Sequence, residues 1–176
     1  MKQPADTASA KGATSSVETR EFLTFDLAGQ EYAVPLLRVR EIVAGLPITP
    51  LAGASGHLLG VVSLRGRMLP VVDMSSLVAN TPHQESRNAS IVVAECQDTE
   101  ESDVTRLVGC IVDSVTEIRP FAESAIQNPP EMQSHLPEGS VMGLAERPQD
   151  SKVVTILDID CLMGNSIRKH SPRLSA

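Results

Sequence analysis

Residues Gly60–Val78 read GVVSLRGRMLPVVDMSSLV, and this stretch decides the fold. Two apolar runs, Gly60–Leu64 and Met68–Val72, have the composition of β-strands. The sequence RGR between them forms a tight turn, because Gly66 can adopt a positive φ at little steric cost. The stretch therefore predicts a β-hairpin that presents Arg65 from a backbone held still by both strands.

A carboxylate follows the hairpin at the point where a helix can begin. Asp73 precedes MSSLV, and Asp158 precedes IDCL near the end of the chain. An aspartate at such a position accepts hydrogen bonds from the first free N–H groups of a helix. Capping accounts for both carboxylates better than a pair of catalytic acids does. We predict a short helix over Met74–Val78 and another that begins at Asp158.

The order of motifs is repeated along the chain. An apolar run precedes V-x-E-I at Val39–Ile42 and again at Val115–Ile118, and each V-x-E-I is followed by a hairpin pattern that ends in D-x-x-x-L. Two halves of about 70–80 residues each, built alike, are the natural interpretation. Many short strands with few helices predict β-barrels. The other expected strands are Glu21–Leu27, Glu31–Val34, Ser90–Glu95, Arg106–Asp113, Val141–Ala145 and Lys152–Leu157.

The composition predicts an aliphatic core under an acidic surface. The 176 residues are 41% hydrophobic, with three Phe, one Tyr and no Trp, enough for one domain or two small subdomains. A net charge of −7 repels a phosphate backbone, so nucleic acid is not expected as a partner. The chain has no apolar signal segment and no run of membrane-spanning length. We expect a cytoplasmic protein with no direct membrane insertion.

Neither a catalytic nor a metal-binding pattern is apparent. The three cysteines, Cys96, Cys110 and Cys161, have no metal or disulfide spacing and are expected to be buried as small apolar residues. His57 lies beside the hairpin and is interpreted as an exposed turn residue. Phosphate loops, nucleophile elbows and zinc motifs are missing from the sequence. We therefore expect no enzyme activity, no metal and no cofactor.

Three segments lack strand or helix patterns. We interpret residues 1–20 as a disordered N-terminal tail and residues 165–176 as a frayed C-terminal tail. The loop Gln97–Thr105 carries four acidic residues. A solvated loop tip is the default interpretation of such a run, and a partner site is the alternative.

Taken together, these motifs make the chain similar to the CheW-like coupling proteins of bacterial chemosensory arrays. The similarity covers about residues 21–164. It implies a mainly β fold of two intertwined five-stranded barrels, SH3-like or OB-like, with short helices. The first barrel would occupy about residues 21–80 and the second about 88–164, with elements partly shared. The segments that carry the similarity are EFLTFDLAGQEYAV (21–34), VREI (39–42), ITP (48–50), GVVSLRGRMLPVVDMSSL (60–77), GCIVDSVTEI (109–118) and residues 143–162.

The resemblance implies a non-enzymatic adaptor. Such proteins couple the cytoplasmic tips of methyl-accepting chemoreceptors to the regulatory domain of a CheA-type histidine kinase, and so lie at membrane-associated arrays through their partners. By position, Arg65 would be the charged contact of the turn. Glu41 and Val39 would line the receptor-facing edge, with Gly60 at the base of the same surface. The two residues expected to close a groove from the second barrel are Val115 and Ile118.

Alternatives remain open for these residues and for the whole chain. Val39, Val115 and Ile118 could be core residues, Glu41 a solvated charge and Gly60 a requirement of strand geometry, whereas no structural reason demands arginine at position 65. A nucleic-acid-binding barrel would need aromatic platforms and a basic groove. A small hydrolase would need a catalytic constellation. A CheW-like adaptor could also serve pili, surface sensing or second-messenger synthesis.

Overall fold

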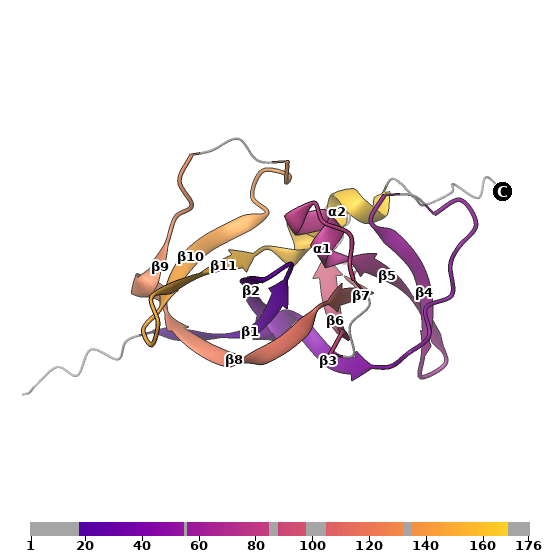
Figure 1. The fold of residues 1–176 in the computed structure, drawn as a ribbon, viewed down its shortest axis with the longest axis horizontal. Helices are drawn as coiled ribbons and strands as arrows, with labels where there is room; N and C mark the ends of the chain where they lie inside the picture. Colours follow the sequence, from indigo (N-terminus) through magenta and orange to yellow (C-terminus); the bar gives the residue numbers. More distant parts are fainter. Residues whose placement is uncertain (1–17, 55, 85–87, 98–104, 132–134, 169–176) are drawn as a thin grey trace, which may run out of the picture.

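The structure is a computed structural model, and it describes residues 18–54, 56–84, 88–97, 105–131 and 135–168. Figure 1 shows two groups of strands side by side, with both α-helices between them. The elements in chain order are β1 (Thr19–Leu27), β2 (Gln30–Pro35), η1 (Leu36–Arg38), β3 (Val39–Ala44), β4 (Leu58–Leu64), β5 (Arg67–Asp73), α1 (Met74–Ala79), β6 (Ser90–Gln97), β7 (Thr105–Val112), β8 (Ser114–Ala122), η2 (Glu123–Ala125), β9 (Ile126–Gln127), β10 (Val141–Arg147), β11 (Lys152–Leu157) and α2 (Ile159–Arg168).

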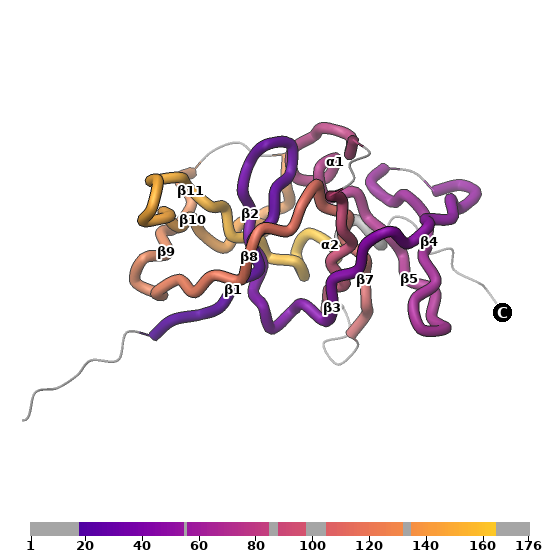
Figure 2. The backbone as a smooth tube through the Cα atoms, turned by 60° about the horizontal axis from the view of Figure 1, so that its bottom comes forward, coloured from indigo at the N-terminus to yellow at the C-terminus, as the bar shows by residue number. Residues whose placement is uncertain are grey.

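The two sheets exchange strands between the halves of the chain. The six-stranded sheet has the order β8-β1-β2-β11-β10-β9, and the five-stranded sheet has the order β3-β6-β7-β5-β4. The chain crosses between the sheets from β2 to β3 and returns from β7 to β8, in the middle of the molecule (Figure 2). The five-stranded sheet is therefore built from the consecutive strands β3–β7, whereas the six-stranded sheet is completed only by strands that lie far apart in the sequence.

The five-stranded sheet closes on itself. Its two edge strands are β3 and β4, and the segment that follows β3 returns to the open side of β4. Thr49 and Val61 exchange both backbone hydrogen bonds there, with N–O distances of 2.8 and 2.9 Å. Closure of this kind leaves fewer unpaired backbone groups than an open sheet.

The apolar core has three parts. One cluster lies within each sheet, around Phe22 and Phe121 in the six-stranded sheet and around Val62 and Val71 in the five-stranded sheet. The third and largest lies between the sheets and includes Met74 and Leu77 of α1 with residues of α2. The helices thus fill the seam between the sheets, and burial of aliphatic surface there holds the two together.

Strand β1 is buried on both faces. Successive side chains of the strand point to opposite faces of the sheet, and the side chains of each face pack in a different apolar cluster. Phe22 packs against Phe121, with ring centroids 5.7 Å apart, whereas Leu23, Phe25 and Leu27 belong to the cluster between the sheets. The strand therefore joins two cores, which explains why its side chains are apolar on one face and partly apolar on the other.

The repeat in the sequence corresponds to a repeat in the hydrogen bonding of the two sheets. Both long hairpins carry a register shift next to a glycine, at Gly60 in β4 and at Gly143 in β10. The aspartates that end these hairpins donate matching hydrogen bonds from their backbone N–H groups, Asp73 N to His57 O and Asp158 N to Ser140 O, both at 2.8 Å. Strand β5 runs parallel to β7 in the one sheet as β11 runs parallel to β2 in the other.

The predicted mainly β fold with short helices is confirmed, and the two-residue β9 gives one sheet a sixth strand. The expected hairpins and helices are present, with β1 beginning at Thr19 and α2 reaching Arg168. The strands β3, β8 and β9 were not predicted. The tails were expected at 1–20 and 165–176, but residues 19–20 belong to β1 and residues 165–168 to α2; the rest of both tails, apart from residue 18, and most of the acidic loop, 98–104, lie outside the described residues. In the part that is described, no helix is long and apolar enough to cross a membrane.

Candidate partner-binding surface

The turn between β4 and β5 presents Arg65 as the sequence predicts. Arg65 and Gly66 form a two-residue turn with φ values of 50° and 78°, between Leu64 and Arg67, which pair across the hairpin. Two successive positive φ values are typical of a type I′ hairpin turn, whose twist matches that of the strands. The side chain of Arg65 is 79% exposed. The guanidinium is therefore offered to solvent from a fixed backbone.

The structure brings two of the predicted site residues together. Nη2 of Arg65 lies 2.9 Å from Oε2 of Glu41, which is on β3 at the opposite edge of the five-stranded sheet. The pair spans the closure of the sheet. An exposed ion pair contributes only about 0–1 kcal/mol to stability. Its main effect here is to fix the direction of a cation on the surface, with its counterion beside it.

Gly60 is buried, and the fold explains why this position requires glycine. A Cβ at this position would overlap the backbone oxygen of Thr49 and lie 2.8 Å from its carbonyl carbon, and the φ of Gly60 is 153°. This close approach belongs to the pairing of Thr49 with Val61. Gly60 therefore supports the hairpin that carries Arg65 from within the sheet.

The apolar candidates fall into two degrees of exposure. Val39 begins β3 and Val115 lies in β8, and both are half-buried against the core between the sheets. Ile118, also in β8, is 52% exposed opposite Leu23. Strands β3 and β8 run along the same lower side of the molecule in Figure 1. The apolar side chain offered to a partner most directly is thus Ile118.

The exposed apolar residues that sequence reasoning did not identify include one in η1 and one beside the Arg65 turn. Leu37 in η1 is 93% exposed, and Met68 beside the Arg65 turn is 63% exposed. In the sequence, Leu37 ends the apolar run Ala33–Leu37 that precedes the first V-x-E-I motif. Pro35 ends strand β2, and the single 3₁₀ turn that follows packs Leu36 on the core and turns Leu37 outward. The proline in the run was the signal that its last residue leaves the strand.

The polar residues near α1 form a structural junction. Asp113 accepts hydrogen bonds from Ser75 Oγ (3.2 Å) and from Ala28 N (2.6 Å), and its Oδ1 lies 3.0 Å from His83 Nδ1. Serine and histidine contact the same carboxylate oxygen, which is not the nucleophile–base–carboxylate order that catalysis uses. The junction ties α1 to the turn between β1 and β2.

His57 has a partner, contrary to its interpretation as a plain turn residue. Its Nδ1 lies 2.9 Å from Oγ of Ser76 in α1. The predicted caps are also present. Asp73 accepts a hydrogen bond from Ser76 N at 2.9 Å, and Asp158 accepts bonds from the N–H groups of Asp160 and Cys161.

The thiols have environments that suppress reactivity. Cys96 and Cys110 are buried, and burial raises the pKa of Cys110 to about 12 and that of Cys96 further. Desolvation also raises the pKa of the partly exposed Cys161. A thiol rather than a thiolate is present at neutral pH in each case. Across the residues that the structure describes, no three His, Cys, Asp or Glu side chains come together as metal ligands.

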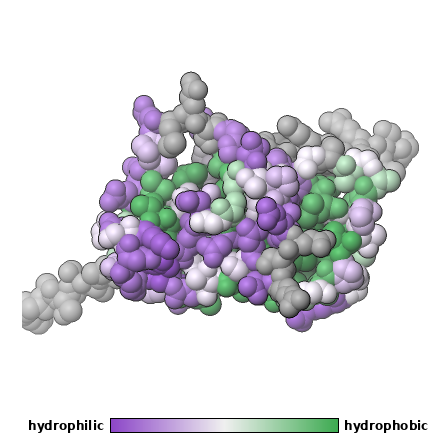
Figure 3. Space-filling view, viewed as in Figure 1, coloured by the Kyte–Doolittle hydropathy of each residue, from purple (hydrophilic) through white to green (hydrophobic). Residues whose placement is uncertain are grey.

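Apolar hollows lie on the described surface of both halves of the molecule. One, of about 630 Å³, includes Leu46, Ile48 and Leu59 of the five-stranded half, and another of the same size includes Tyr32 and Leu144 of the six-stranded half. Figure 3 shows apolar surface at both sides of one face, with hydrophilic residues between. Asp73 and His83 line the first hollow, and His135 and Glu138 line the second.

Comparisons with known proteins identify the family. The CheW-like domain model matches residues 21–166, so the chain belongs to the CheW-like domain family. A probable chemotaxis protein CheW of Rhizobium etli is 27% identical over 147 residues, which is 84% of this chain and 89% of that protein. The chemotaxis protein CheW of Rhizobium meliloti is 28% identical over 150 residues, covering 85% and 91%.

A solved structure agrees with the fold. The scaffolding protein TtCheW of Thermoanaerobacter tengcongensis superposes with a TM-score of 0.71 at 26% identity, over 82% of this chain and 92% of that one. The resemblance inferred from the motifs of the sequence is thereby confirmed.

Proposed function

We propose that this chain is a non-enzymatic adaptor that couples chemoreceptors to a CheA-type histidine kinase, at arrays to which its partners bring it. The observation that carries the proposal is the family match over residues 21–166, which includes both sheets. Relatives of similar length are named chemotaxis proteins, and one is named a scaffolding protein. A nucleic-acid-binding role has no comparable support.

Six residues are proposed as the partner surface: Val39, Glu41, Gly60, Arg65, Val115 and Ile118. The exposed guanidinium of Arg65, oriented by Glu41, supplies charge and direction, and Ile118 supplies apolar area. The half-buried side chains of Val39 and Val115 pack on the core and so hold strands β3 and β8 in place, which carry Glu41 and Ile118. Gly60 acts through the hairpin rather than by contact.

The proposal predicts a large loss of binding when the charge of Arg65 is reversed. Arg65→Glu is expected to weaken binding of a receptor tip or of the kinase regulatory domain by about 2 kcal/mol, as removal of an interface hot spot does. Titrations by calorimetry with both partners, taken from the same genome, measure the change. Arg20→Glu is the matched control, because Arg20 is also exposed and paired with a glutamate, Glu123, and is not one of the six proposed residues.

A charge exchange separates the internal pair from a contact with the partner. The double variant Glu41→Arg, Arg65→Glu restores the ion pair with opposite polarity. If Arg65 contacts a partner, the double variant stays weak; if the single variant acts only by breaking the internal pair, the exchange restores binding. Unchanged binding of both partners by Arg65→Glu would refute the assigned surface. Val115→Asp is titrated with the same partners, and weaker binding by this variant is expected if the six-stranded sheet also contributes to the partner surface.

A further inference from the structure

One face of the six-stranded sheet changes from apolar to charged along its strands. Phe22, Ala33, Ala145 and Val154 belong to the apolar cluster within this sheet. Because side chains two residues apart on a strand share a face, the same face continues with a set of polar residues. They are Thr24 and Asp26 on β1, Glu31 on β2, Arg147 on β10 and Lys152 on β11. One end of this face therefore carries charged side chains in place of apolar ones.

A pocket of about 420 Å³ lies among these side chains, and we call it the charged pocket. Its lining comes from strands β1, β2, β8, β10 and β11 and includes Asp26, Glu31, Thr116, Arg147, Lys152 and Val153. All of the lining residues belong to the part of the chain that the structure describes. The pocket is thus formed by the ends of five paired strands.

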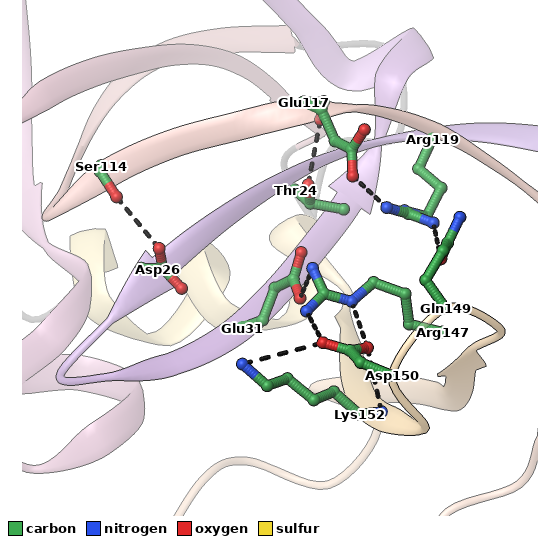
Figure 4. A network of polar contacts seen from close by, with 10 residues as sticks. All are labelled: Thr24, Asp26, Glu31, Ser114, Glu117, Arg119, Arg147, Gln149, Asp150 and Lys152. Atoms are coloured by element: carbon green, nitrogen blue, oxygen red, sulfur yellow. Dashed lines mark hydrogen bonds and ion pairs between the residues drawn. The ribbon is translucent and has the colours of Figure 1, made fainter.

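Only one oxygen of the Glu31 carboxylate has a partner. The side chain is 8% exposed, and its Oε2 lies 3.1 Å from Nη1 of Arg147. The other oxygen, Oε1, is buried and accepts no hydrogen bond from the described residues. Figure 4 shows this second oxygen turned away from Arg147. A buried carboxylate oxygen is stabilised only when a donor reaches it, so Oε1 favours a group that brings N–H donors.

The two cations of the charged pocket are already paired. Arg147 pairs with both Glu31 and Asp150, and Nζ of Lys152 lies 3.8 Å from an oxygen of Asp150. The side chain of Lys152 is 68% exposed, and Figure 4 shows it beside Asp150. Neither cation is therefore free to neutralise a further carboxylate.

Asp26 adds such a carboxylate. It accepts a hydrogen bond from Ser114 Oγ at 3.1 Å and has no ion pair within the described ranges. The carboxylates of Asp26, Glu31 and Asp150 thus outnumber the two cations by one. Glu117 and Arg119, which lie close by in Figure 4, pair with each other and leave this balance unchanged. The charged pocket therefore has an excess of one negative charge.

We propose that the charged pocket binds an alkylammonium group, as carried by a small amine or by a lysine side chain. An ammonium has three N–H donors, which suit Oε1 of Glu31, the carboxylate of Asp26 and the hydroxyl of Thr116. Val153, which is 55% exposed, offers apolar contact to the alkyl chain. An anion is disfavoured by the excess carboxylate. The site does not depend on the adaptor role proposed above.

The test titrates the full, isotope-labelled chain with butylammonium chloride and follows the backbone amide signals by NMR. Saturable shifts are expected at Gly29, Gln30 and Glu31, with a Kd of about 1–10 mM for so small a ligand. Butanol has the same alkyl chain without the charge, and sodium chloride supplies the same ionic strength. Neither is expected to produce saturable shifts at these residues.

Variants separate the charged pocket from the net charge of the chain. Glu31→Gln keeps the shape of the side chain and is expected to raise the Kd about tenfold. Asp26→Asn is expected to raise it about threefold and tests the site independently of the fold of the first variant. Glu146→Gln is the matched control, because Glu146 is exposed on the opposite face of β10, and a change of less than about twofold is expected. Lys152→Met removes a neighbouring cation and should lower the Kd about threefold. Circular dichroism establishes that each variant is folded.

Three outcomes would overturn the proposal. Shifts that do not saturate at ten times the expected Kd would show that no ammonium binds. Equal shifts with butanol would assign the binding to apolar contact, and equal losses in Glu31→Gln and Glu146→Gln would assign it to net charge. The tripeptide acetyl-Gly-Lys-Gly-amide distinguishes the two sources of the ammonium. Tighter binding of the tripeptide than of butylammonium supports a lysine side chain as the natural ligand, and weaker binding supports a free amine.

Discussion

Gly60→Ala is expected to lower the free energy of unfolding by about 4 kcal/mol. The new Cβ would overlap the Thr49 carbonyl, and backbone on both sides of the contact is held by two hydrogen bonds between Thr49 and Val61. Relief requires that the pairing break, which opens the five-stranded sheet. The positive φ of Gly60 adds a further cost for any residue with a Cβ.

Urea denaturation followed by circular dichroism measures this loss. Gly45→Ala is the control, because Gly45 also has a positive φ, +69°, but nothing lies within 4 Å of its added Cβ. About 1 kcal/mol is expected for the control, from backbone strain alone. Equal losses at the two positions would show that Thr49 does not approach Gly60 as closely as the structure has it.

Asp73→Ala has the next largest expected effect, a loss of about 3 kcal/mol. The carboxylate is 4% exposed, and its two oxygens serve different segments. Oδ1 accepts from Ser76 N in α1 and Oδ2 accepts from His83 N, each at 2.9 Å. Alanine would leave both backbone donors without this partner in a partly buried place.

The equivalent cap at the other helix provides the comparison. Asp158 caps α2 through a single oxygen, which accepts from Asp160 N and Cys161 N. Asp158→Ala is expected to cost about 1 kcal/mol, the usual value for a lost cap. Thermal unfolding of both variants gives the difference. A cost for Asp73→Ala no larger than that for Asp158→Ala would mean that the bond to His83 contributes nothing to stability.

The parts of this molecule that sequence chemistry predicts are local. Gly66 fixes a turn and Asp73 fixes a helix start through neighbours a few residues away, and both were predicted in place. Strands β3 and β8 were not, because they lack a continuous apolar run and nearly all of their residues are half-buried or exposed. Their strand character comes from pairing with β6 and β1, which no local pattern reveals.

The candidate sites divide in the same way. Arg65 was predicted to be exposed because a two-residue turn projects its side chains to solvent. Its contact with Glu41 joins opposite edges of a sheet and depends on closure of that sheet. A pocket lined by Arg40, Arg67 and Arg106 depends on the register of several strands, because these residues are dispersed in the sequence. The family resemblance predicted the fold, whereas the contacts between residues from different strands follow only from the strand register.

The exchange of strands between the sheets sets an order for biosynthesis. The five-stranded sheet has all its strands once β7 has left the ribosome, but β2 meets its second neighbour only when β11 has been made. Until then the hairpin of β1 and β2, the first to emerge, carries apolar side chains on both faces and an unpaired edge. Such a segment needs protection from neighbouring nascent chains. The oldest part of the polypeptide is therefore the last to be covered, and chaperone demand should fall only as synthesis nears its end.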